Sequence, residues 1–362
     1  MTRLPGWAEY LLIPILNLSL AFGVAALVVL AIGENPVEAL NVMIQGAFVY
    51  EGAFGYTLYY TTNFIFTGLA VAVAFHARLF NIGGEGQAYL GGLGAILVCL
   101  AFDSWMPGLI LIPLAITGAA ATGAAWAFIP GWLQAYRGSH IVITTIMFNF
   151  IGAGLMVALL AGVLMRGGQS NPESREVAEA ARLPYVHDIV NAFGFDMAST
   201  PLSIAFPVAL LACLGVWVLI WRTRWGYALR AMGQSESAAV YAGIPVRRMI
   251  VTAMAVSGAL AGLMAINTVL GAHGKVVLNF PSGFGFTGIA VALMGRSHPV
   301  GIILAAFLFG ALFQGGTELD FEFQTITREM VLLIQGLIIL FSGALSLMFV
   351  PWITRLVGGR KA

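Results

Sequence analysis

Ten apolar stretches separated by polar loops dominate this sequence and limit the folds open to it. Most of them approach the roughly 20 residues that a helix needs to cross a bilayer. The eighth stretch is too short to cross as a straight helix, so we expect a half-helix, or a tilted or broken span, at that point. The sequence predicts an all-α, polytopic transmembrane helical bundle of about ten spans. The stretches lie at about 11–32, 57–75, 87–102, 109–131, 141–165, 201–221, 249–271, 284–295, 299–315 and 330–350.

Composition supports a membrane-embedded chain and excludes several classes of function. Of the 362 residues, 60% are hydrophobic and 9% are charged, whereas soluble domains carry roughly 25% charged residues. With 17 basic against 16 acidic residues, no polycationic surface is available to neutralise a nucleic-acid backbone. Cys99 and Cys213 lie inside apolar runs and predict neither a disulfide nor a metal site. We therefore expect membrane lipid around the chain, and no nucleic acid or metal.

Basic residues are distributed unevenly over the loops. A cytosolic N-terminus places most of them on the cytosolic side, as the positive-inside rule requires. We expect one transmembrane domain over 1–362 with both termini cytosolic. A polar outer loop should cover about 167–200, with a helical-looking stretch at 173–182, and a basic inner loop should cover about 222–248. The basic residues placed inside are Arg3, Arg78, Arg137, Arg222, Arg224, Arg230, Arg247, Arg248, Arg296, Arg355, Arg360 and Lys361.

One short sequence occurs twice in nearly the same form. Residues 66–72 read Phe-Thr-Gly-Leu-Ala-Val-Ala, and residues 286–292 read Phe-Thr-Gly-Ile-Ala-Val-Ala. Both copies enter the membrane from outside in the expected topology, as a parallel structural repeat requires. The pattern predicts an internal duplication in which spans two to five match spans seven or eight to ten.

The glycine-rich stretch between the second and third spans carries Asn81, Glu85 and Gln87 among glycines 83, 84 and 86. Its glycines permit irregular backbone, and ionisable groups inside a membrane are costly and commonly functional. If the stretch re-enters the bilayer, its three polar side chains would line a polar passage. If it lies at the cytosolic rim, Glu85 would only cap the third span through that span's first free N–H groups.

Uncharged amides occur in the middle of several spans, notably Asn63, Asn149 and Asn267, with Gln314 and Gln335 as further cases. Each one taken singly is typical of a hydrogen bond between neighbouring helices. Together they would suit a conduit for a polar, uncharged solute, because they offer hydrogen bonds without the desolvation cost of a fixed charge. The candidate solute pathway therefore comprises Asn63, Asn81, Glu85, Gln87, Asn149 and Asn267.

No catalytic constellation is apparent in the sequence. The run 283–288 fits G-x-G-x-x-G, but no β-strand precedes it, so we interpret it as small-residue packing at the mouth of a helix. The two lysines, Lys275 and Lys361, stand in no phosphate-binding loop. Small residues within spans let helix backbones approach closely, so Gly91, Gly118, Gly123, Gly258 and Gly262 predict a tightly packed bundle.

The inner loop contains the signals of a short helix outside the membrane. Ser235 can cap a helix over 236–242, Gly243 can end it, and Pro245 prevents its continuation. Such a helix could dock into a groove of a cytosolic partner through alanines 238, 239 and 242 with Tyr241 nearby. It could equally lie on lipid, with arginines reaching the headgroups.

Several of these motifs resemble those of one known family. The segments 80–87, 144–149, 230–244 and 257–263 are similar to the membrane-embedded permease subunits of bacterial ABC importers. The branch it resembles serves nucleosides and uses a binding lipoprotein of the basic-membrane-protein type. Relatives in the wider group carry ribose, other simple sugars or branched-chain amino acids. The resemblance covers about residues 33–313, in the same order.

The resemblance implies a permease subunit of the bacterial inner membrane that translocates purine or related nucleosides by alternating access. ATP would be bound and hydrolysed by a separate cytosolic ABC ATPase, so no cofactor is expected on this chain, and it is not an enzyme. The outer loops would meet the binding lipoprotein, and a second permease subunit, a paralogue or a second copy, would complete the transporter. The residues implied in coupling to the ATPase are Arg230, Ser235, Glu236, Ala239, Tyr241, Gly243 and Ile244.

Other functions stay open at this point. The same machinery could carry a simple sugar or another small polar solute. An ion-coupled secondary transporter would need intramembrane acids, for which only Glu85 qualifies. A membrane enzyme would need an acid–base or nucleophile pair within the spans, and the sequence offers none.

Overall fold

The computed structural model describes residues 12–165, 171–323 and 325–344. The helices are α1 (Ile13–Ile32), α2 (Pro36–Phe48), α3 (Ala53–His76), α4 (Gly84–Phe102), α5 (Gly108–Arg137), α6 (Ile141–Leu159), α7 (Val186–Ala192), α8 (Ala205–Arg222), α9 (Arg224–Gln234), α10 (Glu236–Tyr241), α11 (Val246–Ala265), α12 (Phe284–Met294), α13 (Pro299–Glu322) and α14 (Arg328–Ala344). π-helical turns extend α6 over Leu160–Leu164 and α11 over Ile266–His273. The predicted inner residues Arg3, Arg355, Arg360 and Lys361 lie outside the described residues.

The expected all-α, polytopic architecture is confirmed. Among the described residues, 8 helices are long and apolar enough to cross a membrane, and two shorter apolar helices lie at Phe284–Met294 and Glu329–Ile338. These short helices fall on the eighth and tenth predicted spans. The 11 residues of α12 rise about 16 Å, roughly half of a 30 Å hydrocarbon core. The predicted half-helix is therefore present.

One helix, α2, has no counterpart among the predicted spans. Asn35 caps it by accepting a hydrogen bond from the N–H of Val37 at 3.0 Å, Pro36 stands at its first position, and Glu38 lies in its first turn. These are ordinary signals of a helix start. With 13 residues, α2 is too short to span, so a search for apolar runs of spanning length does not find it.

Contacts within the chain gather it into two compact units, Met1–Thr57 with Ala311–Ala362, and Leu58–Gly310. In the first unit, α1 packs against α2 and α14. Two glycines allow close approach there: a Cβ atom on Gly46 would collide with the side chain of Glu318, and one on Gly315 would collide with the backbone of Met43.

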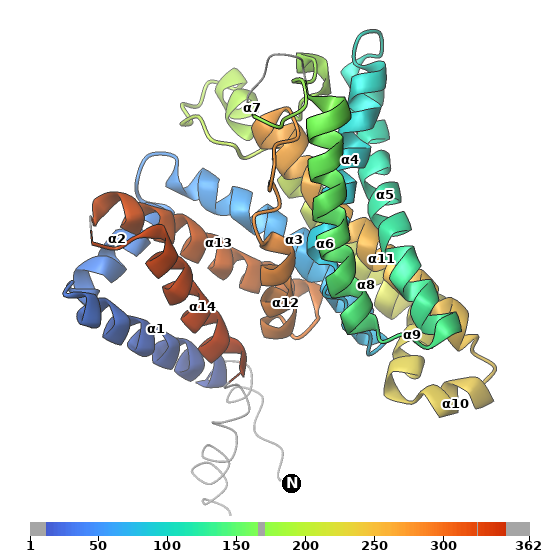
Figure 1. Ribbon diagram of the computed structural model, residues 1–362. Helices are drawn as coiled ribbons and strands as arrows, with labels where there is room; N and C mark the ends of the chain where they lie inside the picture. The colour runs from blue at the N-terminus through green and yellow to red at the C-terminus, as the bar shows by residue number, and fades with distance from the viewer. Residues whose placement is uncertain (1–11, 166–170, 324, 345–362) are drawn as a thin grey trace, which may run out of the picture. The chain divides into compact units, whose positions relative to one another are not determined.

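The second unit is built around α4, α5 and α11, which pack along one another (Figure 1). Glycines stand where these helices touch. A Cβ atom on Gly123 would collide with the backbone of Gly258, and one on Gly91 would collide with the backbone of Gly262. The predicted role of these glycines in helix packing is confirmed.

The two copies of the repeated sequence lie on α3 and α12 and contact each other. A Cβ atom on Gly68 would lie 2.9 Å from a methyl group of Val291, and one on Gly288 would lie 2.5 Å from the Cβ of Thr67. The glycines of both copies therefore sit at a shared helix–helix contact.

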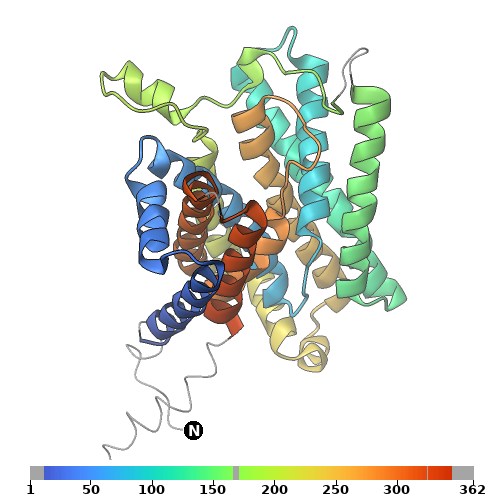
Figure 2. The same cartoon turned by 60° about the vertical axis from the view of Figure 1, so that its left-hand side comes forward.

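The two long polar loops lie at opposite ends of the second unit. Figures 1 and 2 show α7, from the outer loop, at one end of the long helices, and α9 and α10, from the inner loop, at the other. The helices that separate these ends are of spanning length.

Candidate functional site

The glycine-rich segment after α3 is fixed by a buried cluster of polar side chains. The Nδ2 of Asn81 donates hydrogen bonds to Gln87 Oε1 at 2.9 Å and to Ser257 Oγ at 2.8 Å. Its Oδ1 accepts from Gln87 Nε2 at 3.0 Å and from the N–H of Gly83 at 2.9 Å. Asn81 and Gln87 are each 1% exposed. Their amides are therefore engaged with each other and with the backbone that they organise.

Glu85 caps a helix, although not the one expected. It lies in the first turn of α4, but its carboxylate accepts hydrogen bonds from the N–H groups of Gly283 at 2.8 Å and Gly285 at 2.9 Å. Gly283 immediately precedes α12 and has a positive φ of 82°. A carboxylate at a helix N-terminus satisfies free N–H groups and meets the positive end of the helix dipole. The expectation that Glu85 caps its own span is corrected, because its partners belong to α12.

The segment contacts two spanning helices away from their ends. Asn149 accepts from the N–H of Gly86 at 2.8 Å and donates to the carbonyl of Ile82 at 2.9 Å. Asn149 lies about 12 Å along α6, and Ser257, which receives Asn81, lies about 17 Å along α11, at 1.5 Å per residue. Both positions are far from the helix ends. The backbone at 81–86 therefore meets two spanning helices near their middles.

A second amide cluster joins α3 to the π-helical end of α11. Asn267 donates to the carbonyl of Tyr59 at 3.0 Å and to Asn63 Oδ1 at 2.9 Å, and Ser203 donates to Asn267 Oδ1 at 3.4 Å. Asn63 and Asn267 are fully buried. The Nδ2 of Asn63 forms no well-aligned hydrogen bond among the described residues, and the hydroxyl of Tyr59 lies near the same side chain.

Aromatic rings surround the same region of α3. The ring centroids of Tyr60 and Phe284 are 6.0 Å apart, and those of Phe64 and Phe284 are 5.4 Å apart, both in edge-to-face geometry. Phe284 is the first residue of α12, directly beside the glycines that Glu85 holds. The cap on α12 thus also positions the ring of Phe284 against Tyr60 and Phe64 of α3.

The inner loop forms the short helix that the sequence predicts. Ser235 accepts a hydrogen bond from the N–H of Ala238 at 3.3 Å, α10 covers Glu236–Tyr241, and Gly243 ends it at a φ of 77°. Tyr241 is 94% exposed, whereas Ala239 is 2% exposed. Ala239 therefore lies against the rest of the chain, and Tyr241 lies on the side open to a partner.

The remaining residues of the predicted coupling loop are distributed around α10. Glu236 is exposed in its first turn, and the N–H of Ile244 donates to the carbonyl of Ala239 at 2.9 Å, which closes the turn beyond Gly243. Arg230 lies earlier, on α9, and its Nε is buried without a hydrogen-bond partner among the described residues.

The outer loop differs from its expected form. A helix over 173–182 was predicted, but within that stretch only Glu179–Ala181 is helical, as one 3-10 turn. The N–H of Ser174 donates to Val276 at 3.0 Å, and that of Val177 donates to Gly274 at 2.8 Å. Because these N–H groups bond to the segment after α11, they are not available for a helix of their own. Residues 166–170 of this loop lie outside the described residues.

An ion pair ties the outer loop to the end of α4. Arg175 donates to the two carboxylate oxygens of Asp103 at 2.7 and 2.8 Å, and the N–H of Ala178 donates to the same carboxylate at 3.0 Å. The hydrogen bonds from Arg175 hold the pKa of Asp103 below its usual range. Bidentate pairs of this kind are among the stronger polar contacts, so the loop is anchored at a defined position.

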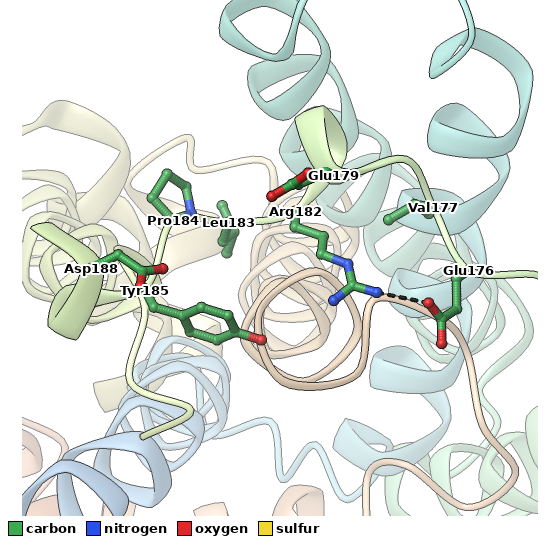
Figure 3. A pocket seen from close by; sticks show the side chains of 8 residues that line it. All are labelled: Glu176, Val177, Glu179, Arg182, Leu183, Pro184, Tyr185 and Asp188. Atoms are coloured by element: carbon green, nitrogen blue, oxygen red, sulfur yellow. Dashed lines mark hydrogen bonds and ion pairs between the residues drawn. The ribbon is translucent and has the colours of Figure 1, made fainter. Parts of the chain in front are cut away.

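A polar pocket of about 530 Å³ opens within this loop (Figure 3). Arg182 reaches across it and donates to Glu176 at 2.9 Å. Three acids and one arginine face the pocket, so its lining carries a net negative charge. The lining residues are Glu176, Val177, Glu179, Arg182, Leu183, Pro184, Tyr185 and Asp188.

Sequence reasoning missed the residues that complete these clusters. Ser257 entered the sequence analysis only as the start of the family-like segment 257–263, without a role, although its hydroxyl accepts from Asn81 and donates to the carbonyl of Ala70 at 2.6 Å. Gly285 packs closely against the backbone at the start of α4, as interpreted from the sequence, whereas Gly283 has open space around it and a positive φ. The N–H groups of both glycines are also the partners of Glu85. The motif predicted a helix start, and nothing near it pointed to a carboxylate 200 residues earlier in the chain.

Known proteins resemble the chain over nearly its whole length. The sequence model of the branched-chain amino acid transport system, permease component, matches residues 53–343. A guanosine ABC transporter permease protein of Bacillus subtilis is 36% identical over 334 residues, covering 92% of this chain and 93% of the relative. A glucose ABC transporter permease protein of Haloferax volcanii is 32% identical, covering 93% and 88%. A nucleoside ABC transporter permease protein of Lactococcus lactis is 31% identical, covering 91% and 90%.

These likenesses extend across the spans, the glycine-rich segment after α3 and the inner loop, and they agree with the resemblance found in the sequence motifs. The helices of spanning length and the buried polar clusters are those of a multi-pass membrane protein. The chain therefore belongs to the family of permease components of branched-chain amino acid transport systems.

Proposed function

We propose that this chain is the permease subunit of an ATP-driven importer that translocates nucleosides, purine nucleosides first, across a bacterial inner membrane. The observation that carries the proposal is the 36% identity to a guanosine permease over 92% of the chain. The whole of 1–362 would act as one transmembrane domain with both termini in the cytosol. A simple sugar is the second candidate solute, because a glucose permease is 32% identical over a similar length.

Solute contacts are best placed at Asn63 and Asn267. The Nδ2 of Asn63 forms no well-aligned hydrogen bond among the described residues, and the aromatic residues Tyr60 and Phe64 are its near neighbours on α3. A nucleobase offers both an acceptor for that N–H and a flat face for the rings, whereas a sugar offers mainly hydroxyl groups. Asn81, Glu85, Gln87 and Asn149 would hold the wall of the pathway, since their polar groups bond to the glycine-rich segment after α3 and to α12.

Coupling to a separate ATPase is proposed at the exposed side of α10. Tyr241 and Val240 are 94% and 59% exposed there, so both side chains are accessible to a partner. Ser235, Gly243 and Ile244 would maintain the shape of the helix, and Glu236 and Arg230 would contribute charge at its start. The partner would move α10, and α9 and α11 would pass that movement to the spans.

The pocket in the outer loop is the proposed contact for a substrate-binding lipoprotein. Its acids favour a basic side chain from that partner, and the Asp103–Arg175 pair keeps the loop in place to receive it. A second permease subunit, either a paralogue or another copy, would complete the pathway.

An ion-coupled transporter is a weaker account of the same structure. Such a protein needs a carboxylate that can bind and release its ion during each cycle. Glu85 is the acid that sequence reasoning offered for this role, and both of its carboxylate oxygens accept hydrogen bonds from the backbone at the start of α12. Releasing them would free the N-terminus of α12.

Uptake competition tests the choice of solute. Cells that express the complete transporter would be given radiolabelled guanosine together with an excess of unlabelled adenosine, uridine, glucose or ribose. We expect purine nucleosides to compete most strongly and the sugars to have no effect. Competition by glucose but by no nucleoside would replace the nucleoside proposal with the sugar alternative.

A further inference from the structure

Three arginines from separate parts of the chain surround one pocket at the α10 end of the second unit. The pocket has a volume of about 460 Å³ and is lined by Arg78 from the turn after α3, Arg230 from α9 and Arg296 from the turn after α12. No acidic side chain is among its lining residues. Its lining is therefore strongly positive, and its chemistry suits an anion.

Two of these arginines occupy turns of the same kind, which follow α3 and α12, the helices that carry the repeated sequence. The φ angles of Arg78 and Arg296 are 55° and 52°, a region that residues other than glycine seldom adopt. The N–H of each donates to the carbonyl three residues earlier, Phe75 at 2.9 Å and Leu293 at 3.0 Å. Two arginines thus adopt an unfavourable backbone conformation, one in the turn after α3 and one in the turn after α12.

The third arginine, Arg230, has a buried N–H donor. The Nε of Arg230 is buried and has no hydrogen-bond partner among the described residues, and a buried donor of this kind calls for an acceptor. Arginines at helix C-termini also meet the negative end of the helix dipole. That effect accounts for Arg78 and Arg296 but not for Arg230, which lies within α9.

The surface that leads to the pocket is apolar. Phe286 and Leu293 lie seven residues apart, on one face of α12, and are 48% and 44% exposed, and Phe75 at the pocket itself is 41% exposed. The face of α12 ends at Arg296. Its length of about 16 Å equals roughly one leaflet of a 30 Å hydrocarbon core. A molecule that matches this surface has an acyl chain of leaflet length and an anionic head.

We propose that the pocket binds the phosphate of an anionic phospholipid headgroup, with an acyl chain along the exposed face of α12. Basic pockets between the ends of spanning helices are suited to such headgroups, and guanidinium groups form bidentate bonds to phosphate. The lipid would join the turns after α3 and α12 to α9, the helix that immediately precedes α10. The site does not depend on which solute the protein carries.

Native mass spectrometry of the purified full-length chain tests the site. Wild type, R78Q/R296Q and the control R247Q/R248Q would be titrated with phosphatidylglycerol or phosphatidylcholine of the same chains. The control removes two exposed arginines from the inner loop, so its net charge equals that of the test variant. We expect wild type and control to retain phosphatidylglycerol at least tenfold more tightly than phosphatidylcholine, and R78Q/R296Q to lose that preference. R78K/R296K, which keeps both charges, should recover part of it and shows whether the turns still fold.

Four results would overturn the proposal. One is equal retention of the two lipids by wild type, and another is an equal loss of preference in the control. If millimolar inorganic phosphate displaced the lipid and itself stayed bound, the pocket would be a site for a soluble anion. If R78Q/R296Q bound lipid as wild type does but assembled less well with an ATPase chain, the pocket would instead receive an acidic side chain of that ATPase.

Discussion

Glu85 holds the N-terminus of a helix that begins 200 residues later in the chain: its Oε2 accepts a hydrogen bond from the N–H of Gly285 at 2.9 Å, and its Oε1 accepts from Gly283 at 2.8 Å. This single carboxylate connects the start of α4 to the half-helix α12. The first residue of α12, Phe284, packs in turn against Tyr60 and Phe64 of α3.

Replacing Glu85 should destabilise the protein through α12. In Glu85→Gln one acceptor becomes a donor that faces an N–H group, and the charge at the helix N-terminus is lost. A buried donor left without its partner costs about 1–3 kcal/mol, so we expect a loss of about 2 kcal/mol or more in thermal unfolding in detergent. Glu236→Gln, an exposed acid in the first turn of α10, is the control. Equal stability of Glu85→Gln and wild type would show that the cap does not contribute to the free energy of unfolding.

Adding one methyl group should separate α5 from α11. A Cβ atom on Gly123 would collide with the backbone of Gly258 and lie 2.9 Å from the Cα of Gly262, so Gly123→Ala has no space without a backbone shift. Overpacking of this kind costs about 1–3 kcal/mol. Gly215→Ala on α8 is the matched control, because nothing lies within 4 Å of a Cβ atom there, and it should be neutral or slightly stabilising. The thermal unfolding midpoints of the two variants should therefore shift in different directions, and similar midpoints would contradict the packing argument.

Asn63 should affect solute binding more than stability. Asn63→Ala removes the donor that forms no well-aligned hydrogen bond among the described residues and leaves the two other hydrogen bonds of Asn267 in place. We expect the KM for guanosine uptake to rise by about tenfold. This factor corresponds to about 1.4 kcal/mol, which is roughly the contribution of one hydrogen bond. Asn149→Ala, which cuts two bonds to the backbone of the glycine-rich segment after α3, should instead lower the amount of folded protein. An unchanged KM in a well-folded Asn63→Ala would remove this residue from the pathway.

The outer loop should loosen at acid pH only when Asp103 is protonated. Arg175 holds the pKa of Asp103 below its usual range. A carboxyl group with a lowered pKa in the folded state contributes stability that is complete above its unfolded pKa of about 3.9 and is lost as the pH falls through the folded value. We expect hydrogen exchange at 174–178, corrected for intrinsic rates, to stay constant from pH 7 to about 4 and to accelerate below. Asp103→Asn should exchange faster at pH 7, whereas the exposed Asp196→Asn should not. Loss of protection between pH 7 and 5 in wild type would contradict the assignment.

The exposed tyrosine of α10 should control coupling. Tyr241→Asp, alone or with Arg230→Glu, should reduce substrate-stimulated ATP hydrolysis by the reconstituted complex several-fold, since a charge would enter the proposed partner groove. Tyr227→Asp on α9, 67% exposed, serves as the control. Hydrolysis that is unchanged in Tyr241→Asp, or equally reduced in the control, would place the partner elsewhere.

Local patterns predicted most of the helices and failed where the partner lies far along the chain. The apolar runs marked the spans, and the short run at 284–295 correctly indicated a half-helix, because length alone decides whether a helix can cross. Ser235 and Gly243 correctly predicted the ends of α10, since caps are local. The stretch 173–182 was predicted as helical, but its backbone bonds to residues about one hundred positions away.

The candidate site illustrates the same limit. Sequence singled out Asn81, Glu85 and Gln87 correctly as unusual residues, but left open whether their segment re-enters the membrane. The structure places that segment against Ser257 and Asn149, which meet it from the middles of two other helices. The sequence around Ser257 or Asn149 does not indicate that either side chain pairs with this segment.

Reconstitution tests the central claim most directly. Proteoliposomes would hold either this chain alone or this chain with its ATPase, second permease subunit and binding lipoprotein, and radiolabelled guanosine uptake would be followed with and without ATP on the cytosolic side. The account predicts uptake only from the complete set and only with ATP. Guanosine uptake by this chain alone, or uptake driven by an ion gradient without ATP, would contradict it.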